Sequence, residues 1–207
     1  MRIAILIFDG LTALDAIGPY EVLSRLPEAE LSFVAKEPGL KRTDTGALGI
    51  SADLAITEIP DPEVVLVPGG EGNRPLLGDD EVLAWLRIAH ESSTWTTSVC
   101  TGALVLGAAG ILGGKRATTH WAYLGRLRDL GAEPVAERVV EDGKIITGAG
   151  VSAGIDMALT LAARISGEKV AEAIQLGIEY DPAPPFDTGS PQKAPSELVE
   201  LIRSQEG

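Results

Sequence analysis

Two short apolar runs, each ended by a glycine-containing turn, indicate how this chain folds. The run at residues 3–8 is followed by a turn at 9–10, and the run at 64–67 by a turn at 68–70. Neither run alternates with polar residues, a pattern typical of strands buried on both faces of a parallel sheet. Segments with apolar residues at helical spacing lie between such runs, so the sequence predicts an α/β fold with a mainly parallel sheet.

The other expected elements continue this alternation. We expect further strands at residues 31–36, 94–99, 135–140 and 144–147, and helices at residues 14–26, 80–91, 101–109, 121–130, 151–165 and 169–178. Two glycines among β-formers predict a small hairpin at residues 43–51. Residues 180–207 predict an extended C-terminal tail, rich in Pro, Gly and Ser, that ends in a short helix at 196–204. We therefore expect one domain over residues 1–207.

Composition narrows the class of partner. The 207 residues include 17 Lys and Arg against 30 Asp and Glu, a net charge of −13, which disfavours a nucleic-acid-binding face because phosphates are repelled. No apolar stretch approaches the ~20 residues that span a bilayer, and the N-terminal run is too short for a signal peptide. A single cysteine excludes an internal disulfide framework, and one cysteine with two histidines provides few ligands for a metal site. We expect a cytoplasmic protein that binds a small molecule.

Cys100 stands where a predicted strand meets a predicted helix. Residues 97–103 read TSVCTGA, the strand–turn–helix context of a nucleophile elbow. The helix start presents unpaired N–H groups and the positive end of a dipole, both of which stabilise a thiolate, so we expect a lowered pKa for the Cys100 thiol. The alternative is a buried, unreactive cysteine at the end of a strand.

Gly69 and Gly70 follow the buried strand at residues 64–67. Ligands of open α/β sheets collect beyond the carboxyl ends of the strands, and adjacent glycines let the backbone approach a reacting atom. The N–H groups of Gly70 and Thr101 are therefore candidates for an oxyanion hole. The alternative is an ordinary glycine turn, and the spacing matches neither a Walker loop nor G-x-G-x-x-G.

Four other polar residues need an interpretation. Asp15 lies among apolar neighbours, where burial would raise its pKa and let it exchange a proton with a thiol or a substrate; alternatively it caps a helix. His120 is a candidate base or substrate contact, or else a structural histidine at a helix start. We expect His90 at a helix surface and Asp156 as a capping or buried hydrogen-bonding group.

Taken together, these segments resemble the ThiJ/PfpI superfamily of class I glutamine-amidotransferase-like proteins. The resemblance runs from residue 1 to about residue 185 and rests on residues 8–15, 67–70, 99–103, 118–121 and 150–156. It implies a flavodoxin-like three-layer α/β sandwich with a mainly parallel central sheet and a nucleophile elbow at Cys100. Because the superfamily is commonly dimeric, it also implies a homodimer.

Three residues narrow the reaction within that superfamily. Peptidase-type members place a histidine after the cysteine, where this chain has Thr101, and the chaperone and glyoxalase branch has a glutamate where this chain has Asp15. Asp15, Cys100 and Thr101 together resemble the isonitrile hydratases, as does the tail at residues 179–187. AraC-type regulators share the N-terminal segments but continue into a helix-turn-helix region, which we do not expect here.

The resemblance implies hydration of a small-molecule isonitrile to an N-substituted formamide, without a metal or an organic cofactor. Asp15 would supply a proton to the isonitrile carbon, Cys100 would form a thioimidate, and Thr101 would orient the water or Asp15. Three alternatives stay open: a glyoxalase-like enzyme acting on a carbonyl compound, a redox or stress sensor based on Cys100, and a domain that binds a small molecule without consuming it.

Overall fold

A seven-stranded sheet runs through the centre of the computed structural model, which describes residues 1–205. Its strands are β1 (Arg2–Leu6), β2 (Glu30–Ala35), β5 (Leu54–Ala55), β6 (Val64–Val67), β7 (Trp95–Val99), β10 (Val139–Asp142) and β11 (Ile145–Gly148). They lie in the order β10-β11-β7-β6-β1-β2-β5. All neighbours are parallel except β10 and β11, which pair antiparallel at one edge around an Asp-Gly turn at residues 142–143.

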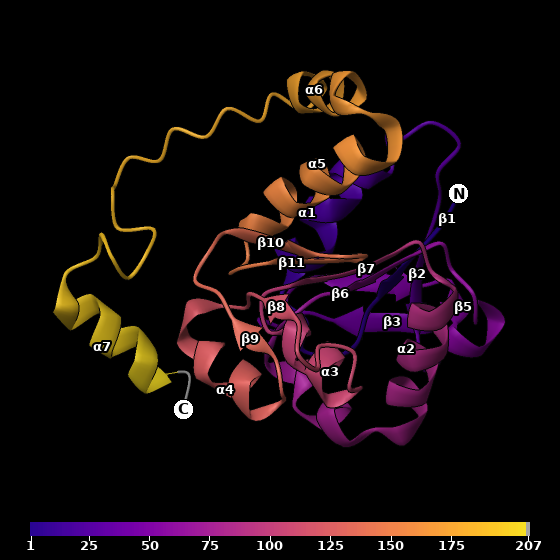
Figure 1. Ribbon diagram of the computed structural model, residues 1–207, viewed down its shortest axis with the longest axis horizontal. Coiled ribbons are helices and arrows are strands. Elements are labelled where there is room, and N and C mark those ends of the chain that lie inside the picture. The colour runs from indigo at the N-terminus through magenta and orange to yellow at the C-terminus, as the bar shows by residue number, and fades with distance from the viewer. Residues whose placement is uncertain (206–207) are drawn as a thin grey trace.

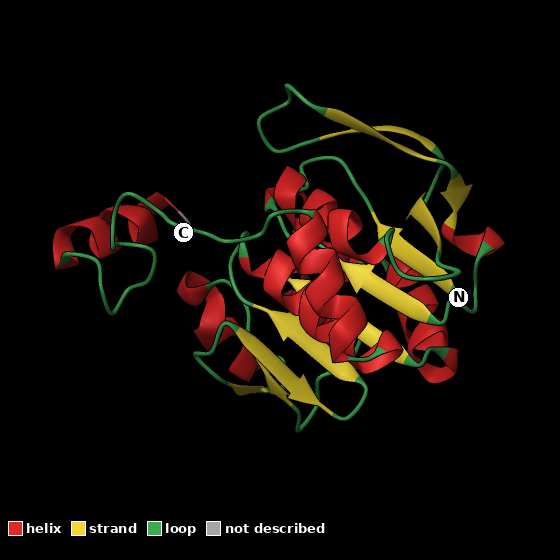
Figure 2. Cartoon of the chain, turned by 90° about the horizontal axis from the view of Figure 1, so that it is seen from above, coloured by secondary structure: helices red, strands yellow, loops and turns green. Residues whose placement is uncertain are grey.

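Helices cover both faces of this sheet (Figure 1). One face carries α1 (Ala13–Leu23), α5 (Ala153–Ser166) and α6 (Glu168–Gly177), and the other carries α2 (Asp80–Ser92), α3 (Gly102–Ala108) and α4 (Leu124–Asp129). Viewed from above, α1 and α5 lie side by side across the strands (Figure 2). This arrangement confirms the predicted three-layer sandwich with a mainly parallel central sheet. None of the helices within residues 1–205 is long and apolar enough to cross a membrane.

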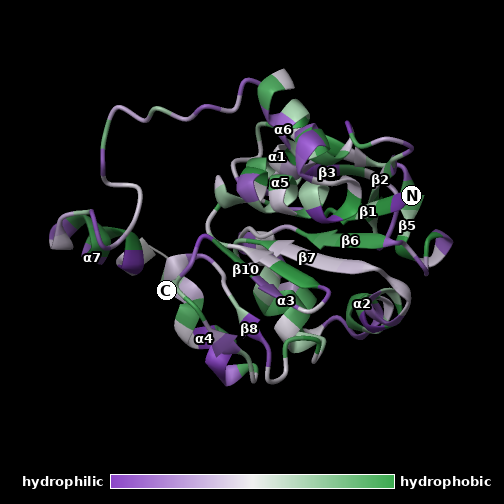
Figure 3. Ribbon diagram, turned by 45° about the horizontal axis from the view of Figure 1, so that its top comes forward, coloured by the Kyte–Doolittle hydropathy of each residue, from purple (hydrophilic) through white to green (hydrophobic). Residues whose placement is uncertain are grey.

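The apolar runs form the centre of the core. All four residues of β6 are buried, as are the last four of β1, and each fully buried aliphatic side chain contributes about 1.5–3 kcal/mol. The neighbouring β7 is paler in Figure 3 because Thr96, Thr97 and Ser98 are polar. Thr97 Oγ1 donates to Val65 O (3.0 Å), and Thr96 Oγ1 contacts His90 Nδ1 (2.8 Å). His90, predicted at a helix surface, is half-buried, because this hydrogen bond turns its ring toward β7.

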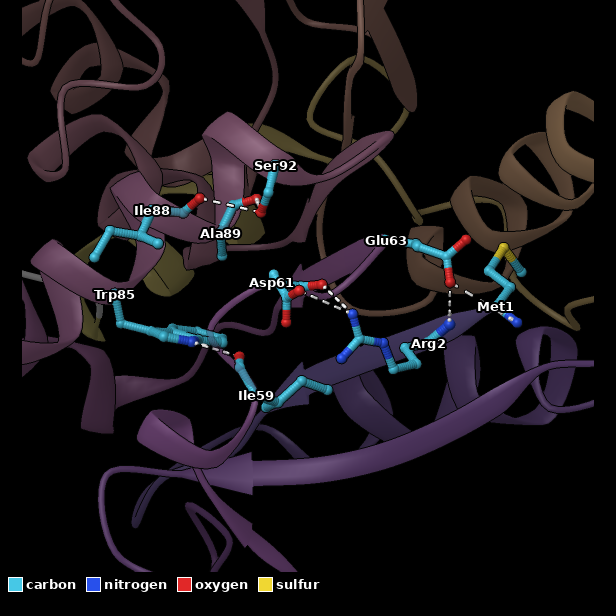
Figure 4. A network of polar contacts seen from close by, with 9 residues as sticks. All are labelled: Met1, Arg2, Ile59, Asp61, Glu63, Trp85, Ile88, Ala89 and Ser92. Carbon is cyan, nitrogen blue, oxygen red and sulfur yellow. Dashed lines mark hydrogen bonds and ion pairs between the residues drawn. The ribbon is translucent and has the colours of Figure 1, made fainter.

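Polar contacts fasten the start of β1 to the segment before β6 (Figure 4). The backbone N–H of Arg2 donates to Glu63 Oε2 (2.8 Å), and its guanidinium donates to the carbonyl of Asp61 (2.9 Å). On the neighbouring helix α2, the indole N–H of Trp85 donates to Ile59 O (3.0 Å). Trp85 is therefore buried with its one polar atom satisfied.

Several element boundaries differ from the predicted ones. The observed hairpin is longer than the predicted one at 43–51 and is formed by β3 (Gly39–Arg42) and β4 (Gly49–Ala52). The predicted range covers its loop and most of its second strand. The predicted helix at 121–130 begins as a 3₁₀ turn, and the predicted strand at 135–140 begins only at Val139. Elements with no clear sequence signal are β8 (Arg116–Ala117), β9 (Glu133–Pro134), and the 3₁₀ turns η1 (Ile56–Glu58), η2 (Glu71–Asn73), η3 (Pro75–Gly78) and η4 (Trp121–Tyr123). These pieces are too short to carry a periodic pattern.

The C-terminal tail leaves the sandwich after α6. Residues 181–195 have no regular structure and lead to α7 (Ser196–Gln205), which lies apart from the sheet in both Figure 1 and Figure 2. The guanidinium of Arg203 in α7 lies 5.6 Å from the ring centroid of Trp121. Over the described residues the tail is extended and ends in a short helix, and residues 206–207 of the predicted tail lie outside them.

Candidate active site

Cys100 forms a sharp turn between β7 and α3. Its φ of +56° lies in the left-handed region, which costs a non-glycine residue about 1–2 kcal/mol. Neighbouring segments hold this conformation: Cys100 N donates to Ala149 O (2.7 Å), and Thr119 Oγ1 donates to Cys100 O (2.7 Å). The predicted nucleophile elbow is confirmed as a backbone geometry.

Asp15 is fully buried in the first turn of α1, beside the elbow. Burial raises the pKa of its carboxyl to about 7. Its Oδ2 accepts the N–H of Gly69 (2.9 Å), so the carboxyl points across the sheet edge rather than capping its own helix. Its Oδ1 has no N–H or O–H donor among the described residues, and the thiol of Cys100 is the neighbouring group with which Asp15 interacts.

The thiol of Cys100 has a raised pKa, which contradicts the lowered value predicted from the helix start. Burial raises it most, and the negative charge of Asp15 raises it further. The backbone N–H groups of Thr101 and Val151 donate to the sulfur and lower the pKa, but they do not outweigh burial. The thiol therefore needs a proton acceptor before it can attack, and Asp15 is the carboxylate within reach.

The two glycines after β6 orient these side chains. The N–H of Gly69 donates to Asp15, and the N–H of Gly70 donates to Thr101 Oγ1 (3.0 Å). A Cβ on Gly69 would lie 2.6 Å from both the N and the Oγ1 of Thr101. Only glycine permits this approach. In this structure Gly70 N–H binds the threonine hydroxyl, so it is not free to form the predicted oxyanion hole with Thr101 N–H.

Asn73 is a buried member of the site that the sequence analysis did not identify. Its side-chain Nδ2 donates to Thr101 O (2.9 Å), and the residue is only 4% exposed. Together with Thr119, it fixes the carbonyls of two successive residues, Cys100 and Thr101. An asparagine in a short 3₁₀ turn carries no sequence signal, and only its contact with the elbow reveals this position.

A cavity of about 260 Å³ opens onto Cys100, small among ligand sites. It is lined by Thr12, Asp44, Gly70, Glu71, Asn73, Arg74, Leu77, Cys100, Thr101, Leu104, His120, Tyr123, Arg126 and Val151. His120 thus lies on the wall of the reaction cavity, its ring 5.5 Å from that of Trp121 and 6.0 Å from that of Tyr123. A second cavity of about 550 Å³, between the tail and the sandwich, shares His120 and Val151 with the first.

Candidate metal ligands do not gather at this cavity. Within residues 1–205, no three His, Cys, Asp or Glu side chains lie close enough together to hold a metal ion. The polar groups at the sulfur are instead one carboxyl, one hydroxyl and backbone N–H donors. This set is suited to proton transfer and covalent catalysis.

The fold and the elbow cysteine define a protein class. The DJ-1/PfpI family matches residues 1–164, so the chain belongs to that family.

Particular relatives extend this likeness over almost the whole chain. The isonitrile hydratase of Pseudomonas putida is 47% identical over 205 residues, covering 99% of this chain and 90% of that protein. A crystal structure of a ThiJ/PfpI family protein from Pseudomonas syringae superposes with a TM-score of 0.95 at 38% identity, covering 99% and 85% of the two chains. An HTH-type transcriptional regulator of Pseudomonas aeruginosa is 30% identical over 79% of this chain but only 49% of its own length.

Proposed function

We propose that this protein is an isonitrile hydratase that converts an isonitrile and water into an N-substituted formamide. The observation that carries the proposal is the buried pair of Asp15 and Cys100, in which a carboxyl with a pKa of about 7 adjoins a protonated thiol. The likeness to the hydratase of Pseudomonas putida supports the same reaction. The small cavity suits a small isonitrile.

In the first half of the reaction, the isonitrile carbon gains a proton and a sulfur. The Asp15 carboxylate takes the proton of the Cys100 thiol and passes it to the carbon while the sulfur attacks the same atom. The product is an enzyme-bound thioimidate, R–N=CH–S–Cys100. The threonine hydroxyl of Thr101 and the backbone N–H groups at the sulfur stabilise the charge that develops there.

In the second half, the thioimidate gains water. Asp15, again ionised, removes a proton from a water that adds to the carbon, and this proton passes to the nitrogen. Collapse of the adduct forms the formamide carbonyl and breaks the carbon–sulfur bond, and the hydroxyl proton returns to Cys100. Positioned acid–base catalysis of this type contributes about 10²–10⁴-fold in rate.

This scheme predicts how activity depends on pH. Asp15 must be ionised to accept the thiol proton, and its pKa is about 7. We expect kcat/KM to rise with pH and to level off above pH 7, since the isonitrile itself does not titrate in this range. A pH profile of the wild type measures this, and a profile that is flat from pH 5 to 9 would contradict the role of Asp15.

The experiment that tests the function is direct. Purified protein is incubated with cyclohexyl isonitrile, and formamide is measured by mass spectrometry, with Cys100→Ala as the matched variant. Formamide from the wild type alone supports the hydratase and the nucleophile together. No formamide from a folded wild type whose thiol reacts with iodoacetamide overturns the proposal; methylglyoxal consumption would then indicate a carbonyl substrate.

A further inference from the structure

The segment between β11 and α5 supports the elbow from behind. Its Ala149 carbonyl accepts the N–H of Cys100 at 2.7 Å, and its Val151 N–H donates to the Cys100 sulfur. The segment therefore contacts both the backbone and the reacting atom of Cys100. The position of this segment therefore decides whether the Val151 N–H points at the Cys100 sulfur.

Arg138, just before β10, fastens this segment near both ends. Its carbonyl accepts the N–H of Ala149 at 2.9 Å. Its guanidinium donates to Ser152 Oγ (3.3 Å) and, through Nε and Nη2, to Asp156 Oδ2 (2.8 and 2.6 Å). One residue thus holds the start of the segment by its backbone and the end by its side chain, and Val151 lies between the two attachments.

Asp156 completes this anchor from the first turn of α5. Its Oδ2 accepts the hydroxyl of Tyr180 at 2.9 Å as well as the two guanidinium donors. Three donors on one oxygen define the position of the arginine fork more narrowly than a single ion pair does. The side chains are 51% exposed for Arg138 and 33% for Asp156. An ion pair this exposed contributes little to global stability, so its location beside the elbow segment is the informative property.

We propose that Arg138, acting through Asp156 and Ser152, is a positioning residue that keeps the Val151 N–H directed at the Cys100 sulfur. The inference rests on the proposed function for its kinetic consequence, but its chemical consequence is a property of the thiol itself. Removing the guanidinium frees the end of the segment, and the sulfur then loses a donor that favours the thiolate.

The chain offers a matched control in a second ion pair. Arg164 and Glu141 also join α5 to β10, at 3.0 Å, with side-chain exposures of 52% and 32%. This pair lies near the C-terminal end of α5, whereas Arg138 binds its N-terminal end. Arg164→Met therefore removes an equally exposed arginine contact of α5 without touching the segment behind Cys100.

The experiment compares Arg138→Met, Arg138→Lys, Asp156→Asn and Arg164→Met with the wild type. The rate of Cys100 alkylation by iodoacetamide is followed from pH 6 to 10, and kcat and KM are measured with cyclohexyl isonitrile. None of the variants replaces Asp15, which interacts with Cys100, or a titratable or charged residue of the cavity wall: Asp44, Glu71, Arg74, His120, Tyr123 and Arg126. Differences between the alkylation profiles therefore report the arginine contact.

For Arg138→Met we expect the alkylation rate at each pH between 6 and 10 to fall at least about threefold and kcat to fall about tenfold, with KM within about twofold. Asp156→Asn should lower the alkylation rate and kcat as well, but by a smaller amount, because the amide keeps the shape of the side chain. Arg138→Lys should retain more of the alkylation rate and of kcat than Arg138→Met does. A lysine ammonium reaches the Asp156 carboxylate but lacks the two donors of the guanidinium. Arg164→Met should match the wild type.

Other outcomes separate the two proposals. If Arg138→Met and Asp156→Asn both have the same alkylation profile as the control Arg164→Met, the positioning role is wrong. If the profile moves only in the Arg138 and Asp156 variants while no protein, wild type included, makes formamide, the positioning role stands and the proposed reaction fails. If Arg138→Met does not fold, the better-tolerated Asp156→Asn decides between these outcomes.

Discussion

Helices α1 and α5 pack side by side, and the first turn of each carries one aspartate in opposite surroundings (Figure 1). Asp15 is fully buried, and in the described part of the chain it has a backbone N–H and a thiol as neighbours but no cation. Asp156 is one-third exposed and binds Arg138 and Tyr180. A carboxylate paired with an arginine is a structural contact, whereas one buried without a cation holds its proton near neutral pH and can transfer it.

Exchanging each carboxyl for an amide should separate these two roles most strongly. Asp15→Asn removes the proton carrier, and we expect kcat to fall by about 10³-fold or more while the fold is retained. Asp156→Asn acts only through the anchor and should cost about tenfold or less. Steady-state kinetics with cyclohexyl isonitrile measure both. Comparable losses in the two variants would mean that Asp15, too, acts only by positioning.

Stability should depend on pH through Asp15. The carboxyl has a pKa of about 7 in the folded protein against an ordinary value of 3.8, so between these values the unfolded chain binds fewer protons and stability falls as pH rises. The free energy of unfolding falls by about 4 kcal/mol in all through Asp15, and roughly 3 kcal/mol of this fall occurs between pH 5 and 8. The Asp15→Asn variant lacks this loss.

Urea unfolding of the wild type and of Asp15→Asn at pH 5 and pH 8 measures the difference. The advantage of the variant should be larger at pH 8. An advantage that stays the same at both pH values would mean that Asp15 is ionised throughout and that its burial costs less than the structure indicates.

The turn that holds Asp15 should tolerate no added methyl. In Gly69→Ala the new Cβ would lie 2.6 Å from the backbone N of Thr101 and 3.0 Å from Asp15 Oδ2. We expect a loss of about 1–3 kcal/mol in unfolding free energy and at least a hundredfold loss of activity.

Gly125→Ala is the control for this substitution. Gly125 lies in α4, and a Cβ there would have no neighbour within 4 Å. It should gain up to about 1 kcal/mol and keep full activity, because alanine favours a helix. Equal behaviour of the two variants in thermal melts and assays would show that the contact at Gly69 is readily relieved.

The packing between α1 and α5 should tolerate an added methyl better. A Cβ on Gly154 in α5 would lie 3.2 Å from the Val99 methyls and 3.3 Å from Pro19 of α1. Small shifts of these side chains can relieve such contacts, and helix propensity offsets part of the cost. We expect Gly154→Ala to change Tm by no more than about 4 °C, or about 1 kcal/mol. A larger fall would place a rigid contact between α1 and α5.

Much of the site could be predicted because its members are marked locally. Cys100 lies between a β-forming run and small residues, and Asp15 stands alone in an apolar helix. Asn73 and Arg138 have no such mark, because they act through partners 28 and 18 residues away. The role of Gly70 was misjudged for the same reason: the partner of its N–H is a hydroxyl on another segment.

Sequence alone determined the layered α/β architecture, the elbow and the burial of Asp15, because hydrophobic periodicity and the turn-forming residues are local properties of the chain. Tertiary structure alone decided the proton chemistry. The helix start at Thr101 suggested an acidic thiol, yet burial and the neighbouring carboxyl raise the pKa of Cys100. Desolvation and charge depend on what surrounds an atom in three dimensions, and no pattern along the chain records that.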